Sequence, residues 1–123
     1  MAATKTILTV DDSATMRDML LETLSSLGYR VVQAGDGMHG LEALEDEQPD
    51  VIITDINMPR LNGIDFIKRV REDTRHRATP ILCLTTENYE GVRDQARRAG
   101  ATGWIVKPFD PQKLADAIRR VMA

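Results

Sequence analysis

The sequence predicts an α/β fold: a parallel sheet of five strands that alternate with five helices on both of its faces. Short apolar or β-branched runs recur along the chain, and each is followed by a longer segment with apolar residues at helical spacing. The connections between these segments are short, which favours parallel strands joined by right-handed crossovers. A length of 123 residues fits one domain, and no repeat or linker interrupts the pattern.

The first predicted strand covers residues 6–10, and Ser13 is a plausible cap for the helix that follows it. Gly28 is expected to end this helix after its apolar face of Met16, Met19, Leu20, Leu24 and Leu27. The second strand covers 30–34. The second helix covers about 38–47, with Leu41 and Leu44 inward, and Pro49 breaks it.

The central predicted strand, Val51-Ile52-Ile53-Thr54, is apolar or β-branched throughout, as expected for a strand buried on both faces. A third helix runs from Ile64 to about Glu72, with Ile64, Ile67 and Val70 inward, and the charged segment 73–77 is expected to be a surface loop. The remaining strands are 80–84 and 103–106. A helix near 89–99, ended by Gly100, lies between them, and Asp110 with Pro111 caps the last helix.

Composition excludes several classes of function. Sixteen basic and 19 acidic residues give a formal net charge of −3, without the basic footprint of a nucleic-acid-binding protein. No apolar run is long enough to span a membrane, and the first residues lack the apolar region of a signal peptide. The single cysteine, Cys83, lies in an apolar run and fits a buried thiol in a reducing, cytoplasmic compartment. His39 and His76 are expected at the surface.

Polar side chains follow the predicted strands, at the edge of the sheet where parallel strands end: Asp11, Asp12, Asp55, Asn57, Thr85 and Lys107. Since ligands bind at this edge in open α/β sheets, we expect these side chains to converge there. Three carboxylates repel one another unless a cation joins them, and oxygen ligands suit Mg²⁺. Lys107 and Thr85 would then hold phosphoryl oxygens, and an Asp carboxylate is a known acceptor in acyl-phosphate chemistry.

At these positions the chain resembles the receiver domains of response regulators, over essentially its whole length. The matching motifs are Val10-Asp11-Asp12, Asp55-Ile56-Asn57-Met58-Pro59 with Gly63, Thr85, and Lys107-Pro108-Phe109. The resemblance implies a flavodoxin-like fold with strand order 2-1-3-4-5 and a cis Lys107-Pro108 bond. It also implies that residues 1–123 form a single receiver domain without an output domain.

The resemblance also implies roles for the site residues. A histidine kinase would phosphorylate Asp55, and Mg²⁺ would be bound by Asp11, Asp12, Asp55 and the backbone carbonyl of Asn57. Lys107 would contact the phosphoryl group, while Thr85 and Trp104 would be the switch residues. Asn57 and Glu87 would modulate the lifetime of the phosphoryl group. Such a protein is not a conventional enzyme but a phospho-acceptor that assists its own phosphorylation and dephosphorylation.

Within the family, the segment Asp12-Ser13-Ala14-Thr15-Met16-Arg17, Asn57 and Glu87 resemble stand-alone chemotaxis members. That resemblance implies a monomer with a chemotaxis histidine kinase as donor, a flagellar motor switch protein or another effector as partner, and a phosphatase. The partner surface would be formed by helix 89–99, strand 103–106 and the last helix. Two positions depart from the usual pattern: Trp104 replaces tyrosine or phenylalanine, and Ile56 stands where some members carry tryptophan.

Four alternatives compete with this interpretation. Gly35-Asp36-Gly37-Met38-His39-Gly40 matches a dinucleotide-binding motif, but Asp36 would repel a pyrophosphate and no room remains for a substrate domain. In a flavodoxin, the first loop would cradle a phosphate, which Asp11 and Asp12 would repel. A haloacid-dehalogenase-type phosphatase needs a second Asp where Asn57 stands. A phosphorelay shuttle would have the same site chemistry and remains open, as does a partner-binding role for Arg93, Arg97 and Arg98.

Overall fold

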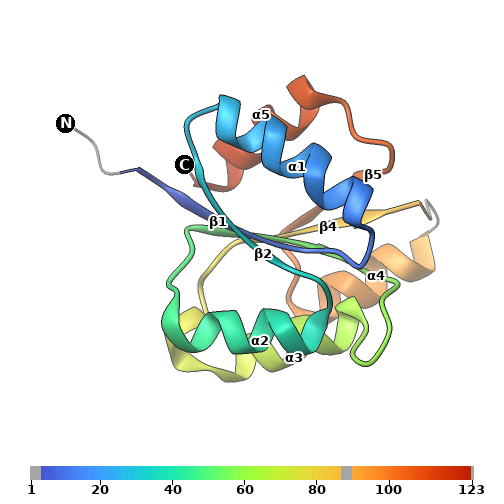
Figure 1. Ribbon diagram of the computed structural model, residues 1–123. Helices are drawn as coiled ribbons and strands as arrows, with labels where there is room; N and C mark the ends of the chain where they lie inside the picture. Colours follow the sequence, from blue (N-terminus) through green and yellow to red (C-terminus); the bar gives the residue numbers. More distant parts are fainter. Residues whose placement is uncertain (1–3, 87–89, 123) are drawn as a thin grey trace.

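The computed structural model describes residues 4–86 and 90–122 and contains the predicted alternation of strands and helices (Figure 1). The five strands form one parallel sheet in the order β2-β1-β3-β4-β5, which confirms the predicted topology. The elements in chain order are β1 (Thr6–Val10), α1 (Ala14–Ser26), β2 (Arg30–Ala34), α2 (Gly37–Asp46), β3 (Val51–Asp55), α3 (Gly63–Glu72), the 3₁₀ helix η1 (Thr74–His76), β4 (Ile81–Thr85), α4 (Glu90–Ala99), β5 (Gly103–Val106) and α5 (Pro111–Met122).

The sheet separates two hydrophobic clusters. Helices α2, α3 and α4 cover one face, and α1 and α5 cover the other (Figure 1). Alternate residues of β3 belong to different clusters, since Ile52 packs with Phe66 on the first face and Ile53 packs with Leu114 on the second. All five residues of β3 are buried, as the apolar run predicted. The last of them, Asp55, is thereby held at the end of the most enclosed strand.

Side-chain caps fix where several helices begin. Ser13 accepts a hydrogen bond from the Met16 amide at 3.2 Å, which confirms it as the cap of α1. Asp36 caps α2, Asn62 caps α3, and the Asp110 carboxylate accepts amide hydrogen bonds in the first turn of α5. Each cap satisfies a backbone donor that the helix itself leaves without a partner.

The apolar face of α1 is narrower than predicted. Leu20 and Leu24 are fully buried, and Met16 packs against their cluster. Met19 and Leu27, which the helical spacing placed on the same face, are 41% and 44% exposed. The buried positions follow a single i, i+4 row, and α1 ends at Ser26, so Leu27 lies outside the helix as its C-cap residue.

The segment 73–77, predicted as a surface loop, instead packs against the rest of the protein. Residues Thr74–His76 form η1, and His76 is fully buried, so the prediction of a surface histidine was wrong. Its Nε2 atom lies 3.3 Å from the carbonyl oxygen of Leu44 at the end of α2. His39, by contrast, is exposed as predicted.

Arg71, near the end of α3, holds the segment 73–77 in this packed conformation. Its guanidinium donates hydrogen bonds to the carbonyl oxygens of His76 and Arg77 at 2.8 and 3.1 Å. It also donates two to Gly100, at 2.8 and 3.1 Å, just beyond α4. Gly100 has a φ of +120°, and a Cβ atom there would lie 2.7 Å from the Arg71 side chain. The C-terminal ends of α3 and α4 are thus tied together at the edge of the sheet where β4 and β5 begin.

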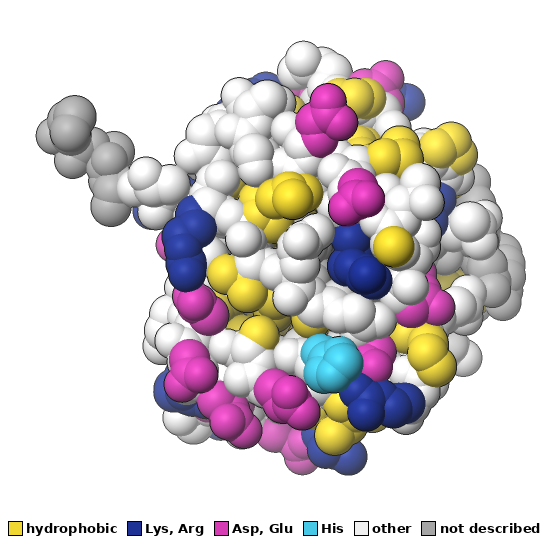
Figure 2. Space-filling view, viewed as in Figure 1, with side chains coloured by type: hydrophobic (Ala, Val, Ile, Leu, Met, Phe, Trp, Pro, Cys, Tyr) yellow, Lys and Arg dark blue, Asp and Glu magenta, His cyan; other side chains and the backbone are white. Residues whose placement is uncertain are grey.

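The surface carries charges of both signs. Figure 2 shows acidic and basic side chains interspersed over α2 and its surroundings on the face in view, without a field of one sign. None of the helices within residues 4–86 and 90–122 is long and apolar enough to cross a membrane.

Candidate functional site

Three carboxylates converge at the carboxyl edge of the sheet, as the sequence predicted. Asp11 and Asp12 directly follow β1, and Asp55 is the last residue of the neighbouring strand β3. Because Val10 pairs with Thr54 in the parallel register, the next residue of each strand reaches the same edge. One carboxylate oxygen from each of the three residues lies within 4.8 Å of the others.

The Asp55 carboxylate is almost enclosed, with 9% of its side chain exposed. Its Oδ1 atom accepts a hydrogen bond from the Ile56 amide at 2.7 Å, and its Oδ2 atom lies 3.1 Å from Lys107 Nζ. Burial raises the pKa of Asp55, the charge of Lys107 opposes that rise, and the neighbouring Asp11 adds to it. The net effect is a raised pKa.

Lys107, directly after β5, supplies one positive charge to the cluster. Its Nζ atom lies 3.1 Å from Asp11 Oδ2 and 3.1 Å from Asp55 Oδ2. Burial lowers the pKa of Lys107, but the two carboxylates outweigh burial and the pKa is raised, so the side chain stays cationic. The Lys107-Pro108 peptide bond is cis, as predicted, and the Lys107 amide donates to the Thr85 carbonyl at 2.9 Å.

The donor set fits a hard divalent cation. One ammonium against three carboxylates leaves the cluster negative, and carboxylate oxygens are the ligands that such cations prefer. Asp11 Oδ1 is held by the Ser13 amide at 2.9 Å, while Asp11 Oδ2 is buried and receives no hydrogen bond from the described residues beyond its ion pair with Lys107. Asp12 is exposed, so the cluster is open to solvent on one side.

Two further predicted site residues, Thr85 and Asn57, lie along the same edge. Thr85 ends β4 and is 1% exposed, beside Val106 of β5. Asn57 is exposed in the loop after β3. Glu87, the second predicted modulator of phosphoryl lifetime, lies outside the described residues.

Trp104 lies in β5, half-buried against α4. The guanidinium carbons of Arg93 and Arg97 are 4.6 and 5.7 Å from the centre of its indole ring, within the range of cation–π attraction. Together with Glu90, these residues line a shallow groove on the α4 side. Arg97 and Arg98 also form ion pairs with Asp94 on the same helix, at 3.5 and 3.0 Å. Arg97 therefore contacts both Asp94 on its own helix and the ring of Trp104.

Sequence reasoning missed two contacts that shape the site. Arg17 of α1 donates a hydrogen bond from Nη1 to the Asp11 carbonyl at 2.7 Å, which no spacing rule signals. Gly63, quoted only as part of a motif, packs directly behind the central carboxylate. A Cβ atom at Gly63 would lie 2.2 Å from the Asp55 carbonyl oxygen, so only glycine fits there.

The glycine motif that resembled a dinucleotide site has a packing role. A Cβ atom at Gly37 would lie 2.6 Å from the Leu61 carbonyl oxygen, and one at Gly40 would lie 2.8 Å from the Phe66 ring. The carboxylate of Asp36, the residue directly before Gly37, is engaged by the His39 amide and by Arg60. Close packing therefore explains why glycine stands at positions 37 and 40, and no bound nucleotide is needed to account for the motif.

The sheet order and the acidic, lysine-bearing site at its carboxyl edge define a class of protein. The family model of the response regulator receiver domain matches residues 7–119, and the chain belongs to this family. Among curated relatives, the chemotaxis protein CheY1 of Helicobacter pylori (strain ATCC 700392 / 26695) is 45% identical over 120 residues, which cover 94% of this chain and 95% of the relative. The chain is the receiver domain of a CheY-like response regulator of two-component signalling.

Solved structures agree with this assignment. The chemotaxis protein CheY4 of Vibrio cholerae superposes with a TM-score of 0.94 at 43% identity, covering 97% of this chain and 99% of that one. The receiver domain of the sensor histidine kinase PA1611 of Pseudomonas aeruginosa has a TM-score of 0.91 at 30% identity, covering 98% of both chains. That structure has a magnesium ion coordinated in its active site cleft.

Proposed function

We propose that the protein accepts a phosphoryl group on Asp55 from a histidine kinase and passes the signal to an effector. The geometry of Asp55 is the main support, because its carboxylate ends the most buried strand beside two further carboxylates and Lys107. Family membership implies a histidine kinase and an effector in general terms. In this proposal Asp11, Asp12, Asp55 and the backbone carbonyl of Asn57 hold Mg²⁺, as their oxygen donors and the magnesium-bearing relative suggest.

The chain's own residues orient the acceptor and neutralise charge. An oxygen of the Asp55 carboxylate forms a bond to phosphorus as the bond from phosphorus to the kinase histidine nitrogen breaks, which gives an acyl phosphate. The Ile56 amide fixes the carboxylate plane through Oδ1, and Lys107 is close enough to move from Asp55 Oδ2 onto a phosphoryl oxygen. Bound Mg²⁺ supplies further charge neutralisation for the phosphoryl oxygens.

In this role the protein is a phospho-acceptor and not a conventional enzyme. It assists its own phosphorylation and dephosphorylation, and a separate phosphatase would shorten its active state. Asn57, exposed in the loop two residues after Asp55, would influence access of water to the acyl phosphate. We assign Glu87 the same kind of role from the family resemblance alone.

The effector surface is assigned to α4, β5 and α5. Thr85, at the end of β4, would turn toward the phosphoryl group, and Trp104 would follow on the α4 side, so that two packings of this surface exchange population. The chemotaxis relatives favour a flagellar motor switch protein as the effector and a cytoplasmic monomer as the signalling form.

Phosphorylation with acetyl phosphate and Mg²⁺, followed by intact-mass measurement, tests the acceptor role. We expect a single phosphate adduct in the wild-type protein and none in Asp55→Asn. An adduct that persists in Asp55→Asn, or a wild-type protein that forms none, would contradict the proposal.

A phosphorelay shuttle is the alternative with the same site. It would pass the phosphoryl group from Asp55 to a histidine-containing domain, whereas a chemotaxis regulator would co-precipitate with switch components when phosphorylated. A haloacid-dehalogenase-type phosphatase is a remote alternative, because Asn57 stands where its general acid would be required. Steady turnover of a phosphate monoester would favour it.

A further inference from the structure

The loop after Asp55 contains a strained turn. Arg60 has a φ of +66°, in the left-handed region that residues other than glycine seldom adopt. The Leu61 amide donates a hydrogen bond to the Pro59 carbonyl at 2.8 Å, so Arg60 is the central residue of a three-residue γ-turn. A γ-turn with positive φ is rare and strained, and such strain persists only where surrounding contacts hold it.

An ion pair with Asp36 holds this turn. Arg60 Nε and Nη2 donate hydrogen bonds of 2.9 and 3.0 Å to the two oxygens of the Asp36 carboxylate. The Asp36 side chain is only 11% exposed and also caps α2 through the His39 amide, so it is itself fixed. Arg60 itself is 54% exposed, but contacts from two of its nitrogens to a fixed carboxylate set the direction of the guanidinium, which an ion pair with a single contact does not.

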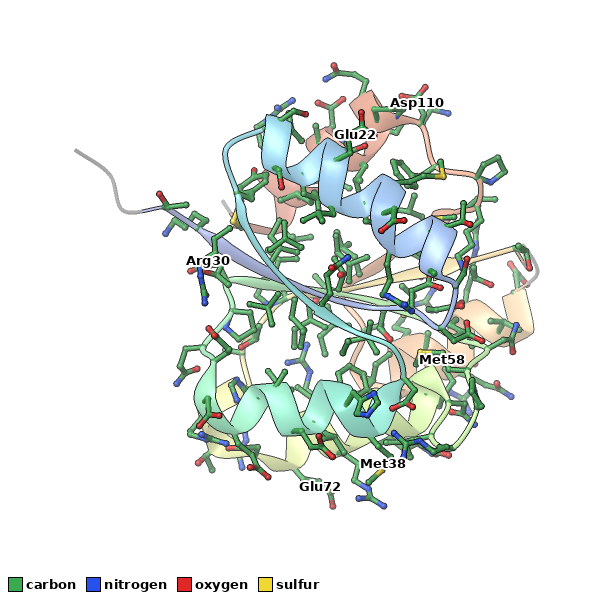
Figure 3. The ribbon with its side chains drawn as sticks, in the orientation of Figure 1. Glu22, Arg30, Met38, Met58, Glu72 and Asp110 are labelled. Carbon is green, nitrogen blue, oxygen red and sulfur yellow. The ribbon has the colours of Figure 1, made fainter. Side chains whose placement is uncertain are left out.

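The start of α2 and the loop after Asp55 are also in contact next to the ion pair. Leu61 is buried, and its carbonyl packs so closely on Gly37 that no Cβ atom would fit between them. The Gly63 amide closes the loop by donating to the Ile56 carbonyl at 2.8 Å. Met38, at the start of α2, and Met58, in the loop itself, mark the two joined regions in Figure 3. The backbone of Asn57 thus lies in a short loop that is anchored at both ends.

We propose that the Asp36–Arg60 ion pair positions the phosphorylation site by holding the γ-turn at Arg60, and with it the backbone carbonyl of Asn57. Asp36 and Arg60 are positioning residues, since neither would touch the metal or the phosphoryl group. This inference rests on the proposed function, which gives the Asn57 carbonyl its role. It predicts that Mg²⁺ affinity depends on a carboxylate that is not a ligand.

The test compares Asp36→Asn with Arg60→Asn. Asparagine caps helices as well as aspartate, so Asp36→Asn should keep α2 while removing the charge that holds Arg60. We expect Mg²⁺ affinity, measured by calorimetry, to fall about tenfold, the lower end of the range for outer partners of metal ligands. The Leu61 amide should also exchange hydrogen faster in the metal-free protein. Arg60→Asn and the double variant Asp36→Asn/Arg60→Asn should lose less Mg²⁺ affinity than Asp36→Asn alone, because asparagine adopts positive φ more readily than arginine.

Glu47→Gln is the matched control. It breaks an ion pair of the same kind, in which Arg30 reaches both Glu47 oxygens at 2.9 Å. Arg30, labelled in Figure 3, lies at the edge of the sheet opposite to Met58, so Mg²⁺ affinity and Leu61 exchange should match the wild type.

Three outcomes would overturn the inference: wild-type affinity and exchange in Asp36→Asn, an equal loss in Glu47→Gln, or an Arg60→Asn loss as large as that of Asp36→Asn. Absence of Mg²⁺ binding by the wild-type protein would instead contradict the proposed function. Leu61 exchange in the metal-free Asp36→Asn protein would then still decide the role of the ion pair, since faster exchange supports it and unchanged exchange refutes it.

Discussion

At the scale of single residues, the site is organised by an excess of negative charge around one lysine. Lys107 contacts Asp11 and Asp55 at 3.1 Å each, while Asp12 adds a third carboxylate within 4.8 Å of the other two. The raised pKa of Asp55 has burial as its main cause and Asp11 as a further one. A bound divalent cation would therefore relieve repulsion that the metal-free protein carries.

Asp12→Ala should separate metal binding from stability. Without metal, its urea midpoint should rise above that of the wild type, because one of three mutually repelling carboxylates is removed. In calorimetry, its Mg²⁺ affinity should fall by at least about tenfold, because a direct ligand is lost. A lower urea midpoint would show instead that Asp12 stabilises the loop after β1.

Cys83 should be chemically silent in the folded protein. The thiol is buried in β4, and burial raises its pKa from 9.0 to about 12, with the charge of Asp55 as a smaller cause. The thiolate that reacts with Ellman's reagent is thus nearly absent at pH 8 in the native state, whereas the unfolded chain has an ordinary thiol. We expect negligible reaction at pH 8 until urea unfolds the protein. Rapid native-state labelling would contradict the burial of this side chain.

The thiol also links stability to alkaline pH. Because the folded pKa is raised, any contribution of Cys83 to stability is fully present below about pH 9 and is lost as pH rises toward about 12. Urea midpoints should therefore fall more steeply with pH above 9 in the wild type than in Cys83→Ala, which has no thiol to ionise.

At the scale of elements, close packing of the backbone at the junction between β3 and α3 determines the position of Asp55. Gly63→Ala would place a Cβ atom 2.2 Å from the Asp55 carbonyl oxygen and 2.7 Å from Ile56 Cα. Relief of this overlap requires the backbone behind Asp55 to move, so we expect a loss of about 3 kcal/mol in unfolding free energy. Phosphorylation by acetyl phosphate should slow as well.

Gly28→Ala is the control for Gly63→Ala. Gly28 has a φ of +92°, but a Cβ atom added there would have no neighbouring atom within 4 Å, so the cost is backbone strain alone, about 1 kcal/mol. Its phosphorylation rate should equal that of the wild type. Equal rates for Gly63→Ala and wild type would show that the close approach has no part in placing Asp55.

The packing of α4 on β5 around Trp104 gives the proposed switch a fluorescence signal. Trp104 is the only tryptophan, and Arg93 lies over its ring at 4.6 Å. Beryllofluoride with Mg²⁺, which stands in for the phosphoryl group, should change the emission or acrylamide quenching of Trp104 as the two packings exchange. Thr85→Ala should reduce this change and leave Mg²⁺ affinity unaltered. Identical fluorescence in both states, with effector affinity still rising, would exclude Trp104 as the switch.

At the scale of the whole molecule, Mg²⁺ should act as a stabilising ligand. A ligand at a concentration 100 times its Kd raises the unfolding free energy by about 2.7 kcal/mol, provided that it binds only the folded state. We expect Mg²⁺ to raise the Tm of the wild type by several degrees, with sodium chloride of equal ionic strength as the control. Asp12→Ala should show little of this shift at the same concentration.

The fold was predictable because its signals are local. Strands β1, β2 and β5 have the predicted bounds, and β3 and β4 differ by one residue at their ends. The convergence of Asp11, Asp12, Asp55 and Lys107 followed from parallel topology alone, since all strands end at one edge. The strand order itself came from the family resemblance.

The features that escaped prediction depend on contacts between distant segments. His76 is buried because Arg71 holds its carbonyl, and the sequence of 73–77 alone is that of an exposed loop. The Asp36–Arg60 ion pair joins residues 24 positions apart. Periodicity describes a single element, so it also could not tell which row of α1 faces the sheet.

The hydrogen bonds from Arg71 to Gly100 fix one end of α4, so that a movement of this helix would be a rotation about that end. The C-terminal end of α4 is fixed to α3 by hydrogen bonds from the Arg71 guanidinium to Gly100, whereas its first residue, Glu90, follows β4, which ends at the proposed phosphorylation site. A ten-residue helix is about 15 Å long, so a rotation of about 10° around the fixed end moves the other end by about 2.5 Å. Any such rotation would therefore displace α4 least at Gly100 and most at Glu90, the end of the helix that follows β4 and the proposed switch residue Thr85.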